Sequence, residues 1–378
     1  MRNIYARLLK EIAIQQPLAL GTIIETSGSS PQVSGASAIF SLDGLVAGTL
    51  GGGILESHAE TEAIRAIRDQ ESRLLPYSLE GELNQEIEAI CGGEVTILLD
   101  AQAKDFLDVF KVMEAALGDR QSGVLVTGIE RSSKNQVSVP ASNSDLSATP
   151  MNVALSRKWI EKSNIFGQEA KEKGFPHREE VKNAFREGTP RLHKVQLVEP
   201  EDSRSDAFLY LEPHFPRAHL VVAGAGHVGK AVAHQGRLLD FEVTVIDDRA
   251  KYANTDNVPD ADRVIVGDIK KVLGEFPKNP DTFIVIVTRG HSHDADALKE
   301  CITSDAGYIG MIGSARKIAL MRQKFLDEGW ATVEKFDRVF APIGLEIQSK
   351  TVEEIAVSIA AQLVLVRNQI QEQRRTKF

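Results

Sequence analysis

The stretch that decides the fold is His219-Leu220-Val221-Val222-Ala223-Gly224-Ala225-Gly226-His227-Val228-Gly229. It sets an apolar strand before a G-x-G-x-x-G pattern, and a helix follows from residue 227 to 239. In a dinucleotide-binding fold, Gly224 allows the tight turn, Gly226 lets a pyrophosphate approach the backbone, and Gly229 lets helix and strand pack closely. The phosphate is expected on the free amides at the helix start, which is His227.

Strands and helices alternate regularly beyond this motif, which predicts a Rossmann-like, doubly wound parallel sheet. The expected strands are 219–223, 242–246, 263–267, 283–289 and 308–312, and the expected helices are 227–239, 294–304, 314–328 and 351–369. Thr351 and Glu354 form a capping box at the start of the last helix. The nucleotide-binding-type domain is assigned to residues 216–378.

Residues 1–215 are predicted to form a mixed α/β domain. Expected strands are 18–26, 36–41, 45–50, 73–79, 94–100, 123–128, 195–198 and 207–211, and expected helices are 54–70 and 106–117. Asp43-Gly44 is a hairpin signal. The segment from about residue 131 to 205 reads as irregular, with an exposed loop over 131–149 and partly helical structure over 157–187.

Composition restricts the function classes. The chain has 378 residues, of which 42% are hydrophobic and 26% charged, and its net charge is −9. An acidic chain without a basic run disfavours nucleic acid as a partner. The two cysteines, Cys91 and Cys301, are too far apart in sequence for a zinc ribbon or a disulfide scaffold. The apolar run 17–24 is too short to span a bilayer, so a cytoplasmic protein without a membrane anchor is expected.

Further anion-suited or polar positions follow the later strands. Asp247 is expected to accept from a ribose hydroxyl and to favour NAD over NADP, with Asp248 and Arg249 as a solvated surface pair. In Gly313-Ser314-Ala315-Arg316-Lys317, Ser314 is placed to cap a helix. Arg316 and Lys317 oppose the dipole of that helix, which makes sense if they hold an anion; a solvated charge pair is the alternative.

Three other groups are weaker candidates. His291-Ser292-His293-Asp294 follows a strand end and suits a polar active-site wall, a metal site or, for Asp294, a helix cap. Gly51-Gly52-Gly53 either cradles an anion or makes a tight turn into a helix. Cys91, which is followed by two glycines, is a soft ligand for a metal-bearing cofactor or a buried, inert residue. Cys301 is predicted to be core.

Taken together, several segments resemble the xanthine dehydrogenase accessory family, also called XdhC/CoxI-like proteins. The resemblance is carried by Gly21–Pro31, Gly48–Glu56, Cys91–Val95, Gly224–Gly229, Val245–Arg249, Tyr308–Lys317, Ala341–Leu345 and Thr351–Ala356. Two departures stand out: Phe340 occupies a position where the family often has His, and Arg289-Gly290 interrupts a stretch that is often acidic and His-rich.

The resemblance implies a protein that binds molybdenum cofactor (molybdopterin) and delivers it to a molybdenum hydroxylase apoenzyme. It also implies a homodimer, and a cysteine desulfurase as a further partner. We expect an accessory protein and assign no catalytic residue and no resident metal. Two alternatives stay open: an NAD-dependent oxidoreductase, for which His291 and His293 are the candidate proton donors, and a nucleotide-sensing regulatory module.

Overall fold

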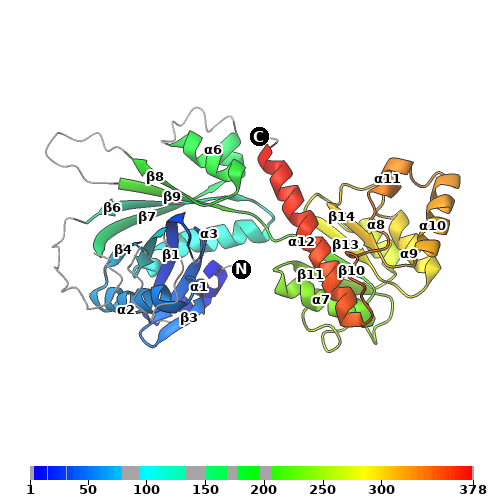
Figure 1. Ribbon diagram of the computed structural model, residues 1–378, viewed down its shortest axis with the longest axis horizontal. Coiled ribbons are helices and arrows are strands. Elements are labelled where there is room, and N and C mark those ends of the chain that lie inside the picture. Colours follow the sequence, from blue (N-terminus) through cyan, green and yellow to red (C-terminus); the bar gives the residue numbers. More distant parts are fainter. Residues whose placement is uncertain are drawn as a thin grey trace. The chain divides into compact units, whose positions relative to one another are not determined.

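The computed structural model describes residues 4–14, 16–30, 32–78, 93–132, 150–167, 177–195 and 207–376. The chain divides into two compact units, Met1–Pro216 and Arg217–Phe378. Each unit contains its own sheet (Figure 1). Each unit also has its own clusters of buried side chains. Among the described residues, no helix has both the length and the apolar character needed to cross a membrane.

The N-terminal unit is built on a nine-stranded sheet with the order β3-β2-β1-β5-β4-β7-β6-β9-β8. The strands are β1 Leu18–Gly28, β2 Ser37–Ser41, β3 Gly44–Gly48, β4 Ser72–Ser78, β5 Gly93–Asp100, β6 Gly123–Arg131, β7 Met151–Glu161, β8 Arg191–Val195 and β9 Ala207–His214. Neighbouring strands pair antiparallel, and the predicted Asp43-Gly44 turn joins β2 to β3.

Helices cover this sheet: α1 Ile4–Ala13, α2 Gly53–Asp69, the 3-10 helix η1 Ala103–Phe106, α3 Leu107–Gly118, α4 Lys162–Phe166 and α6 Arg178–Glu187. The helical spacing predicted for α2 is confirmed, because its apolar residues Leu55, Ala59, Ala63, Ala66 and Ile67 are all buried. All of them except Ala66 pack on inward-facing residues of β1, β2, β4 and β5, which forms one of the cores of the unit.

Within the segment expected to be irregular, the partly helical structure expected over 157–187 is confirmed by α4 and α6, whereas residues 157–161 form a strand. These residues continue β7, which pairs with β6 from Val153 to Glu161. Their charged side chains hide the alternation that marks a strand, while α4 and α6 follow further along. Of the strand expected at 195–198, only Val195 is described, as the last residue of β8. The loop expected over 131–149 lies outside the described residues, except for its first two.

The C-terminal unit has a five-stranded sheet with the order β12-β11-β10-β13-β14, and all of its pairings are parallel. The strands are β10 His219–Ala223, β11 Glu242–Asp247, β12 Arg263–Val266, β13 Thr282–Ile286 and β14 Tyr308–Met311. The helices are α7 His227–Leu238, α8 Ile269–Glu275, α9 His291–Lys299, α10 Ala315–Asp327, α11 Val333–Asp337 and α12 Val352–Thr376.

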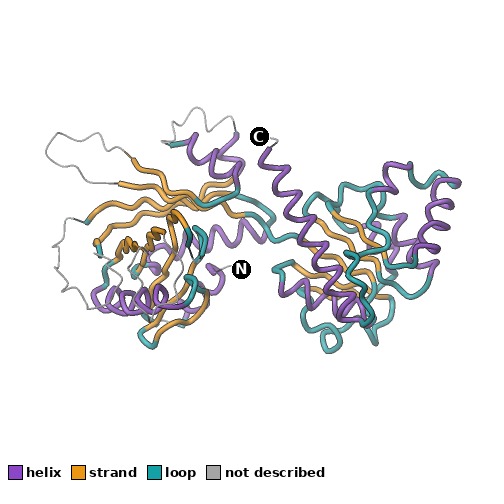
Figure 2. Tube along the Cα trace, viewed as in Figure 1, coloured by secondary structure: helices purple, strands orange, loops and turns teal. Residues whose placement is uncertain are grey.

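Alternate residues of these strands point to opposite faces, and each face is covered by helices (Figure 2). Leu220 and Val222 of β10 pack with α7 and α12, whereas Val221 and Ala223 pack with α8, α9 and α10. The predicted doubly wound parallel sheet is therefore confirmed. The capping box is confirmed as well: the Thr351 backbone N–H donates to the Glu354 carboxylate, and the Glu354 N–H donates to the Thr351 hydroxyl.

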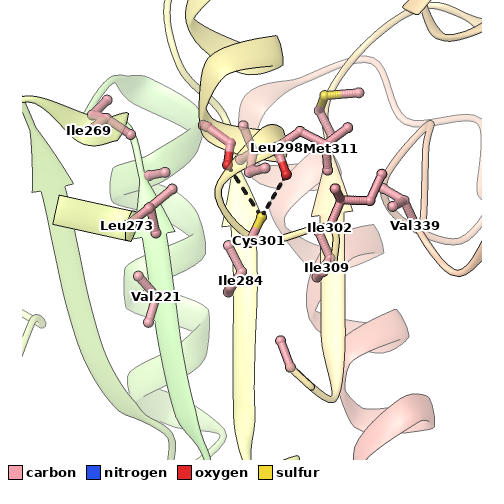
Figure 3. Close-up of a cluster of buried hydrophobic side chains, with 14 of the residues drawn as sticks. Val221, Ile269, Leu273, Ile284, Leu298, Cys301, Ile302, Ile309, Met311 and Val339 are labelled. Atoms are coloured by element: carbon pink, nitrogen blue, oxygen red, sulfur yellow. Dashed lines mark hydrogen bonds between the residues drawn. The ribbon is translucent and has the colours of Figure 1, made fainter. Parts of the chain in front are cut away.

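Cys301 lies just beyond α9 in the second of these cores, as predicted. Its side chain is fully buried among Leu298, Ile302 and Ile309 (Figure 3). The thiol donates to the carbonyl oxygens of Ala297 and Leu298, each 3.4 Å away. Burial raises the pKa of this thiol to about 12, so it is an inert core residue.

Candidate functional site

The candidate site lies at the carboxyl edge of the parallel sheet, between β10 and β13. The helix after β10, α7, covers one face of the sheet, whereas the helix after β13, α9, covers the other. Ligands of doubly wound sheets bind where the connections diverge in this way. The backbones at this point are in close contact, since a Cβ on Gly224 would lie 2.4 Å from the Val287 carbonyl oxygen.

Each glycine of the G-x-G-x-x-G loop has its own surroundings. Gly224 has a φ of 119°, a value that L side chains rarely adopt. A Cβ on Gly229 would lie 1.8 Å from the Gly224 carbonyl oxygen, so no larger residue fits between helix and strand. Gly226 has an ordinary φ of −71°, and a Cβ there would meet no atom within 4 Å. The space over Gly226 is therefore open to a ligand.

Gly226 is also the N-cap of α7, and no side chain among the described residues caps this helix start. The first residue of the helix, His227, is exposed. The amides of the first turn of a helix have no partner within the helix, and the positive end of the helix dipole adds to their attraction for anions. This position therefore offers amide donors, open space and a favourable dipole to an anionic group.

Asp247, at the end of β11, is buried and fully hydrogen-bonded. One carboxylate oxygen accepts from the Arg249 backbone N–H at 3.0 Å and from its Nε at 2.8 Å. The other accepts from the Ala225 N–H and from Arg249 Nη2, both at 2.8 Å. Burial alone would raise the pKa of this carboxyl, but the guanidinium and the two amides outweigh burial and lower it.

This geometry changes the interpretation of two residues. Arg249 keeps the expected ion pair with Asp248, at 3.7 Å, but the pair is not simply a solvated one. The chain turns back after β11 and directs the Arg249 guanidinium mainly onto Asp247, at 2.8 Å. There it stacks over the Tyr252 ring at 4.0 Å. With both Asp247 oxygens engaged, no acceptor is left for a ribose hydroxyl. The repulsion that was expected to favour NAD over NADP is also neutralised by the Arg249 charge.

A second buried pair lies at the ends of β13 and β14. Lys317 Nζ donates to Asp294 at 2.6 Å, and the Asp294 carboxylate also accepts from the Thr288 N–H at 3.1 Å and its hydroxyl at 2.5 Å. The Asp294 side chain is 1% exposed and that of Lys317 is 14% exposed. The charge of Lys317 is thus neutralised within the protein. This pair links the start of α10 to α9, and the ligand-holding role expected for Lys317 stays a prediction.

The two remaining residues of this segment match their expected geometry more closely. Ser314 is the N-cap of α10, and its hydroxyl accepts from the Lys317 backbone N–H at 3.3 Å. Arg316 is exposed in the first turn. Arg289, which follows β13 at the same edge of the sheet, is paired with a carboxylate, because it donates to Asp248 at 3.2 Å. Arg316 is consequently the cation of this segment that projects into solvent beside the sheet edge.

The histidine segment and Phe340 complete this edge. His293 is exposed on α9, and the His291 side chain lies outside the described residues. Phe340, where the family often has His, stacks on Tyr308 with ring centroids 4.8 Å apart. Its backbone N–H donates to Ile309 and its carbonyl accepts from Met311. Phe340 therefore packs onto β14 and brings no polar group to the site.

The N-terminal glycines surround a carboxylate of the protein itself. Glu56, in the first turn of α2, accepts from the Thr49 hydroxyl and the Leu50 N–H at 2.7 Å each, and from the Gly52 N–H at 3.4 Å. Burial opposes ionisation, but these hydrogen bonds outweigh it and lower the pKa of Glu56. The Gly52 amide thus helps to hold this carboxylate, and the Gly51 N–H donates to the Thr49 hydroxyl at 3.0 Å, although the space beside Gly52 and Gly53 is open.

The serine-rich end of β1 lies against the start of β5. Gly28 pairs with Gly93, and a Cβ on Gly93 would lie 2.3 Å from the Ser27 carbonyl oxygen. Sequence reasoning placed Cys91 just before this contact, but Cys91 lies outside the described residues.

Comparison with known proteins gives two family matches. Residues 12–78 match the XdhC and CoxI family, and residues 220–363 match the XdhC Rossmann domain. The two matches together span more than half of the chain. The glycine loop, Asp247, Asp294 and Lys317 all lie within the second match, and Gly51-Gly52-Gly53 lies within the first.

Individual relatives agree with these matches. Over 373 residues the chain is 26% identical to a probable xanthine dehydrogenase subunit of Bacillus subtilis (strain 168), in a match that covers 98% of this chain and 99% of that protein. It is 28% identical over 197 residues to "Uncharacterized protein YqeB" of Escherichia coli (strain K12), covering 50% of this chain and 36% of that protein. The crystal structure of a xanthine dehydrogenase from Bacillus halodurans shares the fold, with a TM-score of 0.66 and 23% identity over 97% of this chain and 96% of that one.

Proposed function

Since this chain belongs to the XdhC and CoxI family, we propose that it is a xanthine dehydrogenase accessory protein, which binds molybdenum cofactor and delivers it to a molybdenum hydroxylase of the xanthine dehydrogenase type. The proposal includes a cytoplasmic homodimer and, for sulfuration of the cofactor, a cysteine desulfurase as a partner. The observation that carries it is the open, uncapped start of α7 at Gly226.

The residues at the sheet edge fit the anionic part of this cofactor. Molybdopterin carries a phosphate, which needs amide donors and a nearby cation. Gly226 and His227 offer the amides, and Arg316 offers an exposed guanidinium at the start of α10. β10 and β14 are separated by one strand, so their ends are about 10 Å apart. When bound, the cofactor supplies the molybdenum centre that the client enzyme uses.

The geometry of Asp247 favours this proposal over an NAD-dependent oxidoreductase. A dinucleotide on this fold places its ribose hydroxyls on the acidic residue that ends the second strand. Here both oxygens of that carboxylate are already held by Arg249 and Ala225. A pterin phosphate makes no such demand, because it needs the glycine loop and a cation and not the carboxylate.

Identification of the ligand tests the proposal. The protein is purified without oxygen, and the bound small molecules are identified by mass spectrometry and molybdenum analysis. Gly226→Val should abolish loading, and Arg316→Ala should weaken it about tenfold or more. Gly118→Val is the matched control, because a Cβ at Gly118 also meets nothing within 4 Å.

A transfer assay completes this test. Apo xanthine dehydrogenase should become active with the wild-type protein and the Gly118→Val protein, but not with Gly226→Val. Cys91→Ser, compared in the same assay, shows whether the thiol retains molybdenum. A copurified nicotinamide dinucleotide, or equal cofactor loading of the Gly226→Val and Gly118→Val proteins, would contradict the proposal.

A further inference from the structure

A group of potential metal ligands lies in the N-terminal unit. His177 is the N-cap of α6, Glu180 is in the first turn of that helix, and His193 is in β8, a strand at the edge of the sheet. α6 lies against the sheet (Figure 1). Its residues Val181, Ala184 and Phe185 are buried with residues of β6, β7 and β9. The packing of one helix on the sheet therefore fixes the position of the whole group.

We propose that His177, Glu180 and His193 form a binding site for a borderline divalent cation, with Zn²⁺ as its best match. The possible ligand atoms of the three side chains all lie within 4.8 Å of one another. Glu180 Oε1 is 3.6 Å from His193 Nε2, and the two imidazole rings have centroids 5.9 Å apart. The proposal does not depend on the function proposed above.

These separations suit coordination by one ion. Zinc binds imidazole nitrogen and carboxylate oxygen at about 2.0–2.2 Å, so two ligands of a tetrahedral site are about 3.3–3.6 Å apart. The Glu180–His193 distance already has this value. The ligand atom of His177 lies within 4.8 Å of both of the others, a gap on the scale of a side-chain adjustment. All three residues are partly exposed, which gives an ion from solution access to the group.

The charged neighbours on α6 are engaged elsewhere. Glu179 forms an ion pair with Lys182, and Arg178 donates to the carbonyl oxygens of Ile165 and Gly167. Glu180, in contrast, is directed to His193. His177 has a φ of 61°, which is a rare left-handed conformation for a non-glycine residue and places its ring beside that of His193.

The donor set determines the class of cation. Two imidazoles and one carboxylate are typical ligands of Zn²⁺ and related transition metals, whereas Ca²⁺ and Mg²⁺ prefer oxygen ligands alone. Three protein ligands leave the fourth position of a tetrahedral zinc ion for water. Binding would also link the start of α6 to the edge strand β8, so we expect it to raise the melting temperature of the chain.

Calorimetry with Zn²⁺ tests the site on the full chain without a histidine tag, after treatment with a chelator. The Cys91→Ser background removes the thiol as a competing ligand. We expect one Zn²⁺ per chain, and His193→Ala and Glu180→Gln should each lower its affinity about tenfold or more. Glu179→Gln is the matched control on the same turn and should bind like its parent.

Two results would overturn the proposal. One is that the parent protein binds no Zn²⁺ and its melting temperature is unchanged by the ion. The other is that binding persists with the same affinity in the His193→Ala and Glu180→Gln proteins, or that Glu179→Gln weakens it equally. Because all of these side chains are partly exposed, the variants are expected to fold, and circular dichroism checks this.

Discussion

Lys317→Met separates the positioning role of Lys317 from the ligand-binding role expected from sequence. The change keeps most of the apolar stem but removes the ammonium group that lies 2.6 Å from Asp294. Asp294 is 1% exposed and would retain only its bonds from Thr288. Removing one partner of a buried ion pair lowers the free energy of unfolding by about 3–5 kcal/mol. Because Lys317 is partly exposed, we expect a loss at the lower end of this range, about 3 kcal/mol.

The loss is measured by urea unfolding with tryptophan fluorescence. The chain has two tryptophans, Trp159 in the N-terminal unit and Trp330 in the C-terminal unit, so a Trp159→Phe background reports on the C-terminal unit alone. Trp330 packs edge-on against Phe325 and lies under the ammonium of Lys299, so unfolding changes its surroundings. With an m-value of about 2 kcal/mol/M, the midpoint should fall by about 1.5 M.

Arg316→Met is the matched control, because it removes a cation from the neighbouring, exposed position. It should change the unfolding free energy by less than about 0.5 kcal/mol. In the double variant Lys317→Met with Asp294→Asn, the loss should be smaller than the sum of the two single losses, since the two residues interact directly. Equal unfolding midpoints for Lys317→Met and Arg316→Met would refute the reasoning.

Three further predictions concern burial. Burial raises the pKa of Glu212 to about 7 from 4.5, so folding favours its protonated form; the free energy of unfolding should fall by about 3 kcal/mol between pH 4.5 and 7 relative to Glu212→Gln, measured by urea unfolding at each pH. Gly229→Ala should lower the unfolding free energy by about 1–3 kcal/mol, whereas Gly226→Ala should not, because only the first Cβ meets backbone; calorimetric melting compares them. In a Cys91→Ser protein, Cys301 should react with a disulfide reagent only after denaturation, since its thiol is fully buried.

The C-terminal fold was largely predictable because its strands are continuous apolar runs between glycines and helix caps. The order of its sheet follows from the alternation of strands with helices and the handedness of the crossovers. The short helices α8 and α11 were not predicted, because seven and five residues carry too little periodicity. β7 was missed for a related reason: Arg157 and Lys158 make its second half look like a charged helix.

The site was predictable in position but only partly in chemistry. Position depends on the glycine loop and the strand ends, which are local features of the sequence. Chemistry depends on partners, and the pairing of Lys317 with Asp294, 23 residues earlier, appears only when α9 and α10 pack on the same face of the sheet. Arg249 shows that the partner of a side chain is hard to predict even between residues that are close in sequence. Its guanidinium binds Asp247, two residues earlier, although a solvent-exposed position was expected.

The two glycine loops show why composition alone does not identify an anion site. Each precedes a helix, and each offers backbone amides to a negative charge. In the N-terminal loop the helix supplies its own carboxylate, Glu56, three residues after Gly53, and the amides of Leu50 and Gly52 bind it. The equivalent position of α7 is Lys230, which is exposed and is a cation. Of these two loops, only the one at Gly226 therefore has helix-start amides that are not occupied by a carboxylate of its own helix. It also has a cation, Lys230, at the position where the other helix has that carboxylate.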